Sequence, residues 1–555
     1  MSTIQAVHTT PIQGQKPGTS GVRKKVTEVL QPHYIENFTQ SCFNTVKERE
    51  VLEGSTIVVS GDGRYYNKTA IQTILKVAAG NRVGRVWVGQ NGILSTPAVS
   101  VIIREREGGI ALGGLILTAS HNPGGPNADF GIKYNIGNGG PAPEDWTNRI
   151  YEHTISISEY SIADIPDVDI SSLGRTEFQV DGRPFVVEVI DSTEDYVAKM
   201  QSIFNFDDLR ALVSRPDFKI HYDCLSGVSG PYARHIFHRI LGVPLEQIKN
   251  SEPLEDFGGG HPDPNLVYAH DLVHAMGIGA EVQHGDYPDF GAANDGDADR
   301  NMILGKQFFV TPSDSVAVLA ANSAAIPYFA GGLKGVARSM PTSTAIDFVG
   351  QKLGIQVYEV PTGWKFFGNL MDAGRLSICG EESFGTGSDH IREKDGVWAV
   401  LAWLSVIAYK NKNSDHLVGV EEIVRSHWQE YGRNYYMRYD YENVDSNAAN
   451  QLMETLKNKF SEFQGQADSY EYTDPVDHSV TKNQGLRFIT PEWRVIYRLS
   501  GTGSSGATVR VYYEKYEKVN LDLSTDQALG SIIDWSLKFS DINAILSVTG
   551  PTVIT

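Results

Sequence analysis

Three short runs between residues 55 and 89 indicate the fold class: STIVVS at 55–60, KTAIQTILKVAAG at 68–80 and RVWVG at 85–89. The first and the last are short and apolar, as strands are, whereas the middle run has the apolar spacing of an amphipathic helix. A strand, a helix and a second strand at this spacing predict a βαβ unit, and therefore a parallel or mixed sheet.

The same pattern recurs further along the chain. Residues 218–242 (FKIHYDCLSGVSGPYARHIFHRILG) predict a strand, a glycine turn and a helix, and residues 333–363 (LKGVARSMPTSTAIDFVGQKLGIQVYEVPTG) predict a strand, a helix and a strand. The last stretch differs, because strand-like runs such as RVIYRLS at 494–500 accompany amphipathic runs such as NAANQLMETLKNKF at 447–460. We therefore predict three α/β units in series, followed by a smaller α+β domain.

The chain has 555 residues, which is more than one hydrophobic core usually organises, so several domains are expected. A polar run at 410–418, KNKNSDHLV, is typical of a linker, and a helical pattern, GVEEIVRSHWQEYG, follows it. The predicted domains are 1–191, 192–309, 310–409 and 420–555.

The composition is that of a soluble globular protein, with 41% hydrophobic and 21% charged residues. The formal net charge of -19 argues against a nucleic-acid or acidic-membrane partner, and it requires any anion site to gather its cations locally. The longest apolar run, at 396–409, is too short to span a bilayer and predicts a buried helix. The first 25 residues contain no apolar signal segment, and three scattered cysteines fit a reducing cytosol.

A metal site is predicted at 294–301, where the sequence is NDGDADRN. Asp295, Asp297 and Asp299 alternate, so an extended loop would direct the three carboxylates to one side, where a cation is needed to offset their repulsion. Oxygen ligands without His or Cys favour Mg²⁺ over Zn²⁺. A calcium EF-hand is excluded because its sixth and twelfth positions would be arginine and lysine. A solvated acidic turn is the alternative, and Arg300 directly after the acidic residues weighs against it.

A candidate nucleophile lies in the run TASHNPGG at 118–125, where apolar residues lead to Ser120 and then to a glycine loop. A serine in such a loop is most often only a cap. The G-x-S-x-G motif of acyl-transfer enzymes is absent, and the neighbouring His121 need not be the base. A hydroxyl beside a Mg²⁺ site suits phosphoryl transfer better, and Lys133 adds a cation to the same loop system.

A candidate sugar-binding loop has the sequence GEESFGTGSDHIREKDG, residues 380–396. Glu381, Glu382 and Ser383 offer acceptors and a donor between glycines, which suits the recognition of sugar hydroxyls. An ordinary polar loop is the alternative for this segment taken alone.

A candidate phosphate loop has the sequence YRLSGTGSSGATVRVYY, residues 497–513. It contains G-x-G-x-x-G, but a dinucleotide fingerprint must open a helix, whereas ATVRVYY continues as a strand. The turn can instead direct N–H groups and hydroxyls toward an anion, with Arg498 and Arg510 supplying charge. The turn residues are Ser500, Gly501, Thr502 and Gly503. A plain hairpin would leave the two arginines unexplained.

Four motifs follow one another in an order that resembles the α-D-phosphohexomutase superfamily: TASHNPGG, DGDADR, GEESFGTGSDH and RLSGTGSSGATVR. The long form GEESFGTGSDHIREKDG is similar to that of the eukaryotic-type phosphoglucomutase branch. The resemblance extends from KPGTSGVRKK near residue 20 to the last hundred residues, and none of the four motifs departs from the family pattern.

This resemblance implies four domains around one central cleft: three related α/β domains with mixed sheets and a smaller, mobile α+β domain at the C-terminus. It implies that Ser120 is a phosphoserine and that Asp295, Asp297 and Asp299 bind Mg²⁺ together with its phosphate. The implied transfer site consists of Arg23, His121, Lys133 as proton acceptor, and Arg300. The implied sugar site consists of Thr362, Gly363, Glu381, Ser383 and Lys394. The implied clamp for the second phosphate consists of Arg498, Ser500, Gly501, Thr502 and Arg510.

The implied activity is that of a cytoplasmic isomerase that interconverts glucose 1-phosphate and glucose 6-phosphate. A phosphoserine enzyme and glucose 1,6-bisphosphate, which also serves as activator, would be the intermediates. The expected partners are small sugar phosphates, with no nucleic acid and no membrane, and the expected state is a monomer. Two alternatives remain: a mutase or bisphosphate synthase with another sugar preference, such as a phosphomannomutase, and a non-catalytic adhesion or scaffold relative. The latter should have lost Ser120, one of the aspartates or Arg510, and all are present.

Overall fold

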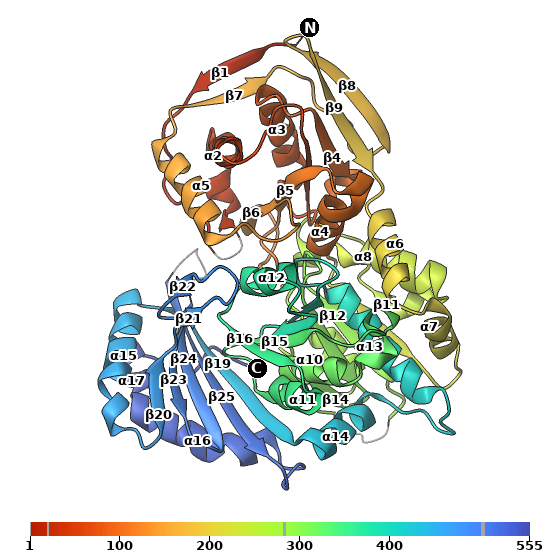
Figure 1. Ribbon diagram of the computed structural model, residues 1–555, viewed down its shortest axis with the longest axis vertical. Coiled ribbons are helices and arrows are strands. Elements are labelled where there is room, and N and C mark those ends of the chain that lie inside the picture. The colour runs from red at the N-terminus through yellow and green to blue at the C-terminus, as the bar shows by residue number, and fades with distance from the viewer. Residues whose placement is uncertain (1, 19–20, 281–284, 501–505) are drawn as a thin grey trace.

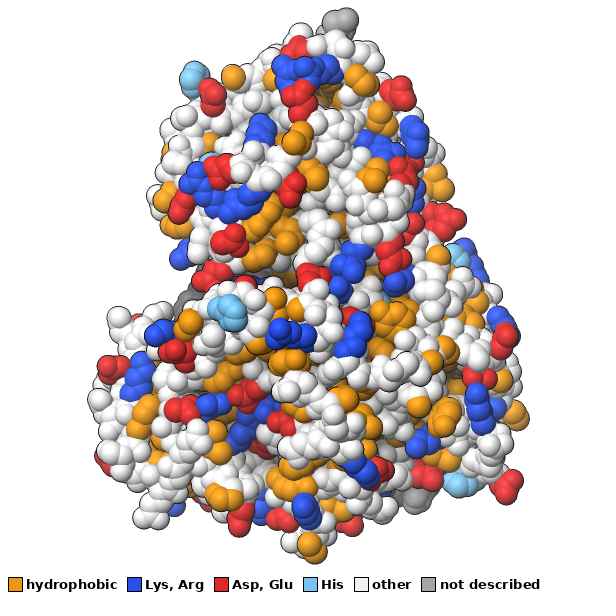
Figure 2. All heavy atoms as spheres, viewed as in Figure 1, with side chains coloured by type: hydrophobic (Ala, Val, Ile, Leu, Met, Phe, Trp, Pro, Cys, Tyr) orange, Lys and Arg blue, Asp and Glu red, His pale blue; other side chains and the backbone are white. Residues whose placement is uncertain are grey.

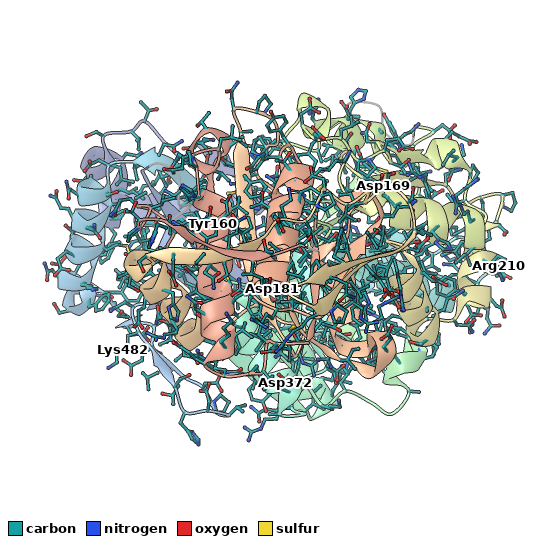
Figure 3. All side chains as sticks on the ribbon, turned by 90° about the horizontal axis from the view of Figure 1, so that it is seen from above. Tyr160, Asp169, Asp181, Arg210, Asp372 and Lys482 are labelled. Atoms are coloured by element: carbon teal, nitrogen blue, oxygen red, sulfur yellow. The ribbon has the colours of Figure 1, made fainter. Side chains whose placement is uncertain are left out.

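The computed structural model describes residues 2–18, 21–280, 285–500 and 506–555. An upper lobe formed by the N-terminal third stands on a broad base, in which the middle of the chain and the C-terminal part lie next to each other (Figure 1). Seen from above, Arg210 of the second unit and Lys482 of the fourth lie on opposite sides of the molecule, with Tyr160 and Asp181 of the first unit between them (Figure 3).

The first unit is built on a seven-stranded mixed sheet. Across the sheet, its strands are β2 (Val22–Lys25), β6 (Asp129–Ile136), β5 (Ala111–Leu117), β3 (Thr56–Gly61), β4 (Arg85–Gly89), β9 (Arg183–Ile190) and β8 (Gly174–Val180). A separate pair is formed by β1 (Ile4–His8) and β7 (Glu159–Ala163). The helices are α1 (Val26–Val29), α2 (Tyr34–Lys47), α3 (Asn67–Gly80), α4 (Thr96–Glu105) and α5 (Glu144–Ser156). Because β3 and β4 are parallel and α3 connects them, the predicted βαβ unit is confirmed.

The second unit is a five-stranded sheet, again mixed. Its strands in order are β11 (Ile248–Lys249), β10 (Ile220–Asp223), β12 (Phe290–Asn294), β13 (Asn301–Gly305) and β14 (Phe308–Val310). The helices are α6 (Glu194–Ile203), α7 (Phe206–Val213), α8 (Ser229–Ala233) and α9 (His270–Ala275). The helix predicted after β10 is confirmed, but beyond α8 it continues as a π-helix over Arg234–Ile240, which the apolar spacing did not indicate.

The third unit is a four-stranded mixed sheet. Its strands in order are β16 (Gln356–Val360), β15 (Gly335–Ser339), β17 (Ile378–Glu381) and β18 (Gly385–Ser388). Its helices are α10 (Pro312–Ala321), α11 (Ala345–Leu353), α12 (Trp364–Asp372) and α13 (Gly396–Asn411). Helix α13 confirms the prediction of a buried helix, since most of its residues are buried and its N-terminal turn is capped by the Asp395 side chain. The next helix, α14 (Val420–Tyr431), packs on α10 and α11.

The fourth unit is a six-stranded antiparallel sheet with helices. Its strands in order are β20 (Gln466–Ser469), β23 (Leu486–Ile489), β24 (Trp493–Ser500), β25 (Ala507–Glu517), β19 (Arg433–Val444) and β26 (Val553–Ile554). A small hairpin, β21 (Tyr472–Thr473) with β22 (Val480–Thr481), and the helices α15 (Ser446–Asn458), α16 (Thr525–Ser540) and α17 (Ile542–Leu546) complete it. The predicted fold class, three α/β units and a C-terminal α+β unit, is thus confirmed.

The third and fourth units share a core, which fixes where the fourth unit presents its loops. Ile496 of β24 and Tyr512 of β25 are buried against Met340 and Phe367 of the third unit. The contact is also polar, because the buried carboxylate of Glu514 accepts hydrogen bonds at 2.7 Å from the backbone N–H and from the hydroxyl of Thr344. The hairpin that carries the predicted phosphate loop is therefore anchored beside the predicted sugar loop.

The surface carries mixed charge, and acidic and basic side chains are intermingled on the face shown in Figure 2. All three cysteines are buried and unpaired. Within the described ranges, no helix is long and apolar enough to cross a membrane.

Candidate active site

Ser120 lies in the turn that follows β5, as the sequence predicts. The side chain is buried, and its Oγ donates a hydrogen bond of 2.7 Å to Oδ2 of Asp295, from the second unit. The Nδ1 atom of His121 lies 3.4 Å from the same Oγ. The predicted nucleophile and the predicted metal site are therefore in direct contact, although they belong to different units.

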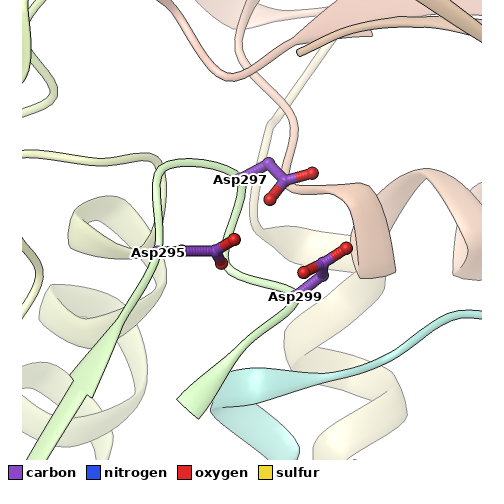
Figure 4. Close-up of side chains that lie close together, drawn as sticks. All are labelled: Asp295, Asp297 and Asp299. Atoms are coloured by element: carbon purple, nitrogen blue, oxygen red, sulfur yellow. The ribbon is translucent and has the colours of Figure 1, made fainter. Parts of the chain in front are cut away.

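The three aspartates occupy the tight loop between β12 and β13, and their side chains converge (Figure 4). One carboxylate oxygen of each lies within 4.8 Å of the others, and all three residues are buried. Oδ1 of Asp297 and Oδ1 of Asp299 are buried without a hydrogen-bond partner. Buried carboxylate oxygens without a partner are costly unless a cation satisfies them, so this set of hard oxygen donors fits Mg²⁺.

The electrostatics of the loop support the same assignment. Burial and the neighbouring Asp297 and Asp299 raise the pKa of Asp295 well above its usual range. For Asp297 burial also acts to raise the pKa, but Lys133 and a hydrogen bond of 2.7 Å from the Thr96 hydroxyl outweigh it, so the pKa is lowered. The carboxylates compete for one region of low dielectric, which is the situation that a divalent cation relieves.

An open cleft of about 290 Å³ lies above these loops. Eleven of the residues predicted for the site line it: Arg23, His121, Arg300, Thr362, Gly363, Glu381, Ser383, Lys394, Arg498, Ser500 and Arg510. They come from all four units, and long stretches of sequence separate them. Members of the three predicted groups, for transfer, sugar and phosphate, therefore meet at one cavity. Ser120, Lys133 and the three aspartates are not among the residues that line it.

The predicted sugar residues form one wall of the cleft. The N–H of Gly363 donates a hydrogen bond of 3.2 Å to Oε1 of Glu381, which joins the start of α12 to the end of β17. Burial raises the pKa of Glu381. Oγ1 of Thr362 and Oε1 of the neighbouring Glu382 are buried without a partner, so this wall holds polar atoms that a bound hydroxyl could satisfy.

Lys394 is also in the cleft, but its ammonium lies 3.0 Å from Oδ2 of Asp299. It therefore lies at the loop that carries Asp295, Asp297 and Asp299, called the acidic loop below, although the resemblance assigned it to the sugar. Lys133 is buried on β6, and its Nζ lies 3.3 Å from Oε1 of Glu393. Glu393 also accepts a hydrogen bond of 2.9 Å from the side-chain amide of Asn135.

The predicted phosphate loop joins β24 to β25, which pair antiparallel with Arg498 opposite Arg510. The expectation that the chain continues as a strand rather than a helix is confirmed. Gly501, Thr502 and Gly503 lie outside the described residues. Arg510 approaches Oδ2 of Asp440 at 3.5 Å, and its Nε is buried without a hydrogen-bond partner. The Arg498 side chain donates to the carbonyl of Gln484 at 3.2 Å and to the Tyr512 hydroxyl at 3.1 Å.

Two other predicted residues complete the transfer side of the cleft. Arg300 lies 3.8 Å from Asp263, and its Nε is buried without a partner. Burial and the nearby Arg300 and Arg23 lower the pKa of His121 well below its usual range, so its imidazole is neutral at pH 7.

Glu393 and Thr96 contact the site, although neither was predicted. Glu393 lines the cleft and belongs to the predicted sugar loop 380–396, so the motif that indicated Glu382 could also have indicated it. Thr96, which donates to Asp297 from the start of α4 in the first unit, has no motif around it. Only the folded arrangement identifies it.

Four family models match the chain in succession. They are described as phosphoglucomutase/phosphomannomutase alpha/beta/alpha domain I (residues 14–161), domain II (194–307) and domain III (312–431), and as the phosphoglucomutase-1 C-terminal domain (433–552).

Similar proteins of known name agree with these matches. A cytoplasmic phosphoglucomutase of Pisum sativum is 57% identical, covering 100% of this chain and 99% of its own. A cytoplasmic phosphoglucomutase of Zea mays is also 57% identical, with the same coverage. The crystal structure of parafusin from Paramecium, a phosphoglucomutase in its open form, superposes with a TM-score of 0.94 at 54% identity, over 100% of this chain and 99% of that chain. The chain therefore belongs to the phosphoglucomutase/phosphomannomutase family.

Proposed function

We propose that this protein is a cytoplasmic phosphoglucomutase, an isomerase that interconverts α-D-glucose 1-phosphate and α-D-glucose 6-phosphate. Relatives with that name and compartment, 57% identical over 99% of their length, support the reaction. The observation that carries the chemistry is the Ser120 hydroxyl, which lies 2.7 Å from Asp295 and directly precedes His121, a residue that lines the cleft with the cationic and sugar-facing residues.

In the proposed relay, phosphorylated Ser120 gives its phosphoryl group to O6 of glucose 1-phosphate, which yields glucose 1,6-bisphosphate. This intermediate turns end over end in the cleft. The Ser120 oxygen then takes the phosphoryl group from O1, and glucose 6-phosphate leaves. Phosphate monoesters hydrolyse extremely slowly in water, so the protein must supply most of the rate by positioning and charge neutralisation.

Mg²⁺ is the proposed cofactor, held by Asp295, Asp297 and Asp299 together with the phosphate on Ser120. Two of the three carboxylates carry a buried oxygen without a partner, which supports this assignment. When bound, the cation neutralises negative charge on the transferring group. Glucose 1,6-bisphosphate is the proposed activator, because it can phosphorylate Ser120 when the enzyme has lost its phosphate.

Lys133 is the proposed acceptor of the proton that the attacking sugar hydroxyl releases. To accept it, Lys133 must first give up its own proton, and Oε1 of Glu393, 3.3 Å away, is a near acceptor. Burial raises the pKa of Glu393, which favours a proton on that carboxyl. His121 and Arg300 would contact the transferring group, and Arg23 would add charge from β2.

Thr362, Gly363, Glu381 and Ser383 are the proposed sugar ligands, and Lys394 would serve both the sugar and the acidic loop. The phosphate that is not being transferred would bind Arg498, Ser500 and Arg510, with Gly501 and Thr502 predicted to join them. Two sites are needed because the two poses of the intermediate exchange its phosphates between Ser120 and the clamp.

The domain boundaries, the closure of the C-terminal domain and the oligomeric state are also proposed here. The proposed domains are 1–191, 192–309, 310–409 and 420–555, and the packing of α14 on α10 and α11 favours moving the last boundary to the end of α14. Closure of the C-terminal domain over the cleft would exclude water and protect the phosphoserine. We further propose a monomer that binds small sugar phosphates and neither nucleic acid nor membrane.

A direct assay tests this function. The purified protein, supplied with Mg²⁺ and a trace of glucose 1,6-bisphosphate, is given glucose 1-phosphate or mannose 1-phosphate in parallel. Rapid formation of glucose 6-phosphate is expected. A clear preference for mannose 1-phosphate would overturn the choice of sugar, and no turnover of either would favour a non-catalytic role.

A further inference from the structure

The backbone of Ser120 is left-handed, with φ at 54°. This region crowds Cβ against the backbone, so residues other than Gly, Asn and Asp rarely adopt it. Strained conformations persist where the surrounding contacts over-determine them, and they cluster at functional sites. The residues packed beneath Ser120 supply such contacts.

A closed ring of hydrogen bonds surrounds the Ser120 peptide. The N–H of Ser120 donates to Oγ1 of Thr118 at 2.8 Å, and that hydroxyl donates to Oδ2 of Asp62 at 2.6 Å. Asp62 accepts from Nε of Arg64 at 2.9 Å, and Nη2 of Arg64 donates to the carbonyl oxygen of Ser120 at 2.9 Å. Each group in this ring has its own partner, and all four residues are buried.

Arg64 also holds the far end of the same loop. Its Nη1 donates to the carbonyl oxygen of Asp129 at 2.9 Å and to that of Asn122 at 3.3 Å. Arg64 is 1% exposed, so these carbonyls replace water as the acceptors of its guanidinium. One side chain therefore ties the start and the end of the Ser120 loop together, which the fixed fork of arginine donors allows and a lysine would not.

The other side of the Ser120 carbonyl is blocked by the acidic loop. A Cβ added to Gly296 would lie 2.7 Å from the carbonyl oxygen of Ser120, so the two backbones are already in contact. Phe257 packs in the same place, with its ring 5.1 Å below the Arg64 guanidinium. Displacement of the Ser120 peptide would consequently move its hydroxyl relative to Asp295.

We propose that Thr118, Asp62 and Arg64 are positioning residues for phosphoryl transfer, holding Ser120 left-handed so that its Oγ faces the acidic loop. The proposal rests on the proposed function, because it concerns the geometry of the same serine. It adds a role for three side chains that belong neither to the aspartate cluster nor to the lining of the cleft.

Thr118→Val tests the ring of hydrogen bonds with the smallest change in side-chain shape. Valine has nearly the same shape, and it removes both hydrogen bonds of the hydroxyl while it leaves Arg64 paired with Asp62. We expect kcat, and the single-turnover rate of phosphate transfer from Ser120, to fall about 10- to 100-fold with KM within about twofold, because a misplacement near 1 Å costs that much. Thr118→Ser restores the hydroxyl and should recover most of the rate.

Thr45→Val is the matched control. Thr45 is a fully buried threonine of α2 whose hydroxyl donates to the Ser41 carbonyl at 3.0 Å, outside the cleft. It should lower the melting temperature but leave kcat unchanged. If Thr118→Val lowers the melting temperature as Thr45→Val does and keeps the wild-type kcat, the positioning role is wrong. Ser120→Ala, measured alongside, distinguishes failure of the positioning role from failure of the proposed function. Turnover in that variant would refute the phosphoserine relay itself.

Discussion

The Ser120 hydroxyl donates a hydrogen bond of 2.7 Å to Asp295, across 175 residues of sequence and between two units of the fold. A serine that served only as a turn cap would bond to its own loop. This serine instead meets a cluster of three buried carboxylates. The contact joins the group proposed to carry phosphate to the group proposed to bind the cation.

Replacing Ser120 by alanine is expected to abolish mutase activity, because no other hydroxyl hydrogen-bonds to Asp295 in the described part of the chain. The change removes one buried hydrogen bond but little volume, so the variant should stay folded with at most a modest fall in melting temperature. Turnover with glucose 1-phosphate, together with circular dichroism, checks both parts. Substantial turnover in a folded variant would show that Ser120 does not carry the phosphate.

Arg510→Ala should lower kcat/KM by a factor of about 30 to 150, or roughly 2 to 3 kcal/mol, because the second phosphate loses a charge-assisted donor. The buried Nε of Arg510 makes no hydrogen bond and only a 3.5 Å ion pair with Oδ2 of Asp440, so it remains able to donate to a bound phosphate. Steady-state kinetics measure the effect. A loss of stability with normal kinetics would instead assign Arg510 to the packing around Asp440.

Mg²⁺ should stabilise the folded protein, because the three aspartates repel one another without it. At 100 times the dissociation constant, a bound ion adds about 2.7 kcal/mol to the free energy of unfolding. A melting curve with and without Mg²⁺ measures this, with Asp299→Asn as the variant expected to respond weakly. An equal response in that variant would place the cation elsewhere.

Gly296→Ala should impair the site with little change in the rest of the fold. The new methyl group would lie 2.7 Å from the Ser120 carbonyl oxygen and 3.0 Å from the Phe257 ring, so the serine loop and the acidic loop must move apart. We expect lower kcat and weaker Mg²⁺ binding, measured by activity against metal concentration. Gly530→Ala, in α16 where a Cβ meets nothing within 4 Å, is the control and should be neutral. Wild-type kinetics for Gly296→Ala would contradict the close contact.

A pH effect on stability is expected from Asp314, which is buried at the start of α10 and accepts a hydrogen bond of 3.1 Å from the Trp428 indole. Burial raises the pKa of Asp314 to about 6. Since the folded pKa lies above the unfolded value near 4, the protonated group stabilises the fold at low pH, and this contribution is lost as pH rises through about 6.

Asp314→Asn keeps the shape and an acceptor for Trp428 without the charge. It should therefore raise the free energy of unfolding at pH 8 by about 2 to 3 kcal/mol, and by about half as much at pH 5. Urea unfolding at the two pH values measures the difference. The same gain at both pH values, or none at pH 8, would show that Asp314 does not titrate in this way.

The fold class could be predicted because its evidence is local. The apolar runs around β3, α3 and β4 lie within 35 residues of one another, and each carries its own periodicity. The π-helix at Arg234–Ile240 could not, because it covers only seven residues, too few for its wider turn to change the apolar pattern recognisably. The packing of α14 on α10 and α11 depends on contacts across about 100 residues. The polar run that precedes α14 in the sequence gave no reason to expect these contacts.

The site also contains residues that the sequence could predict and contacts that it could not. Asp295, Asp297 and Asp299 were predictable because they share one loop. The pairing of Lys133 with Glu393 joins residues 260 positions apart, and the contact of Lys394 with Asp299 joins the third unit to the second. Neither has a sequence signal, because a long-range contact depends on how whole units pack.

The phosphoserine relay is tested most directly by the intact mass of the protein before and after incubation with glucose 1,6-bisphosphate and Mg²⁺, followed by peptide mapping. We predict that dephosphorylated enzyme gains one phosphate, that the phosphate maps to Ser120, and that excess glucose 1-phosphate removes it. A phosphate on any other residue, or no covalent phosphate in an active enzyme, would contradict the relay.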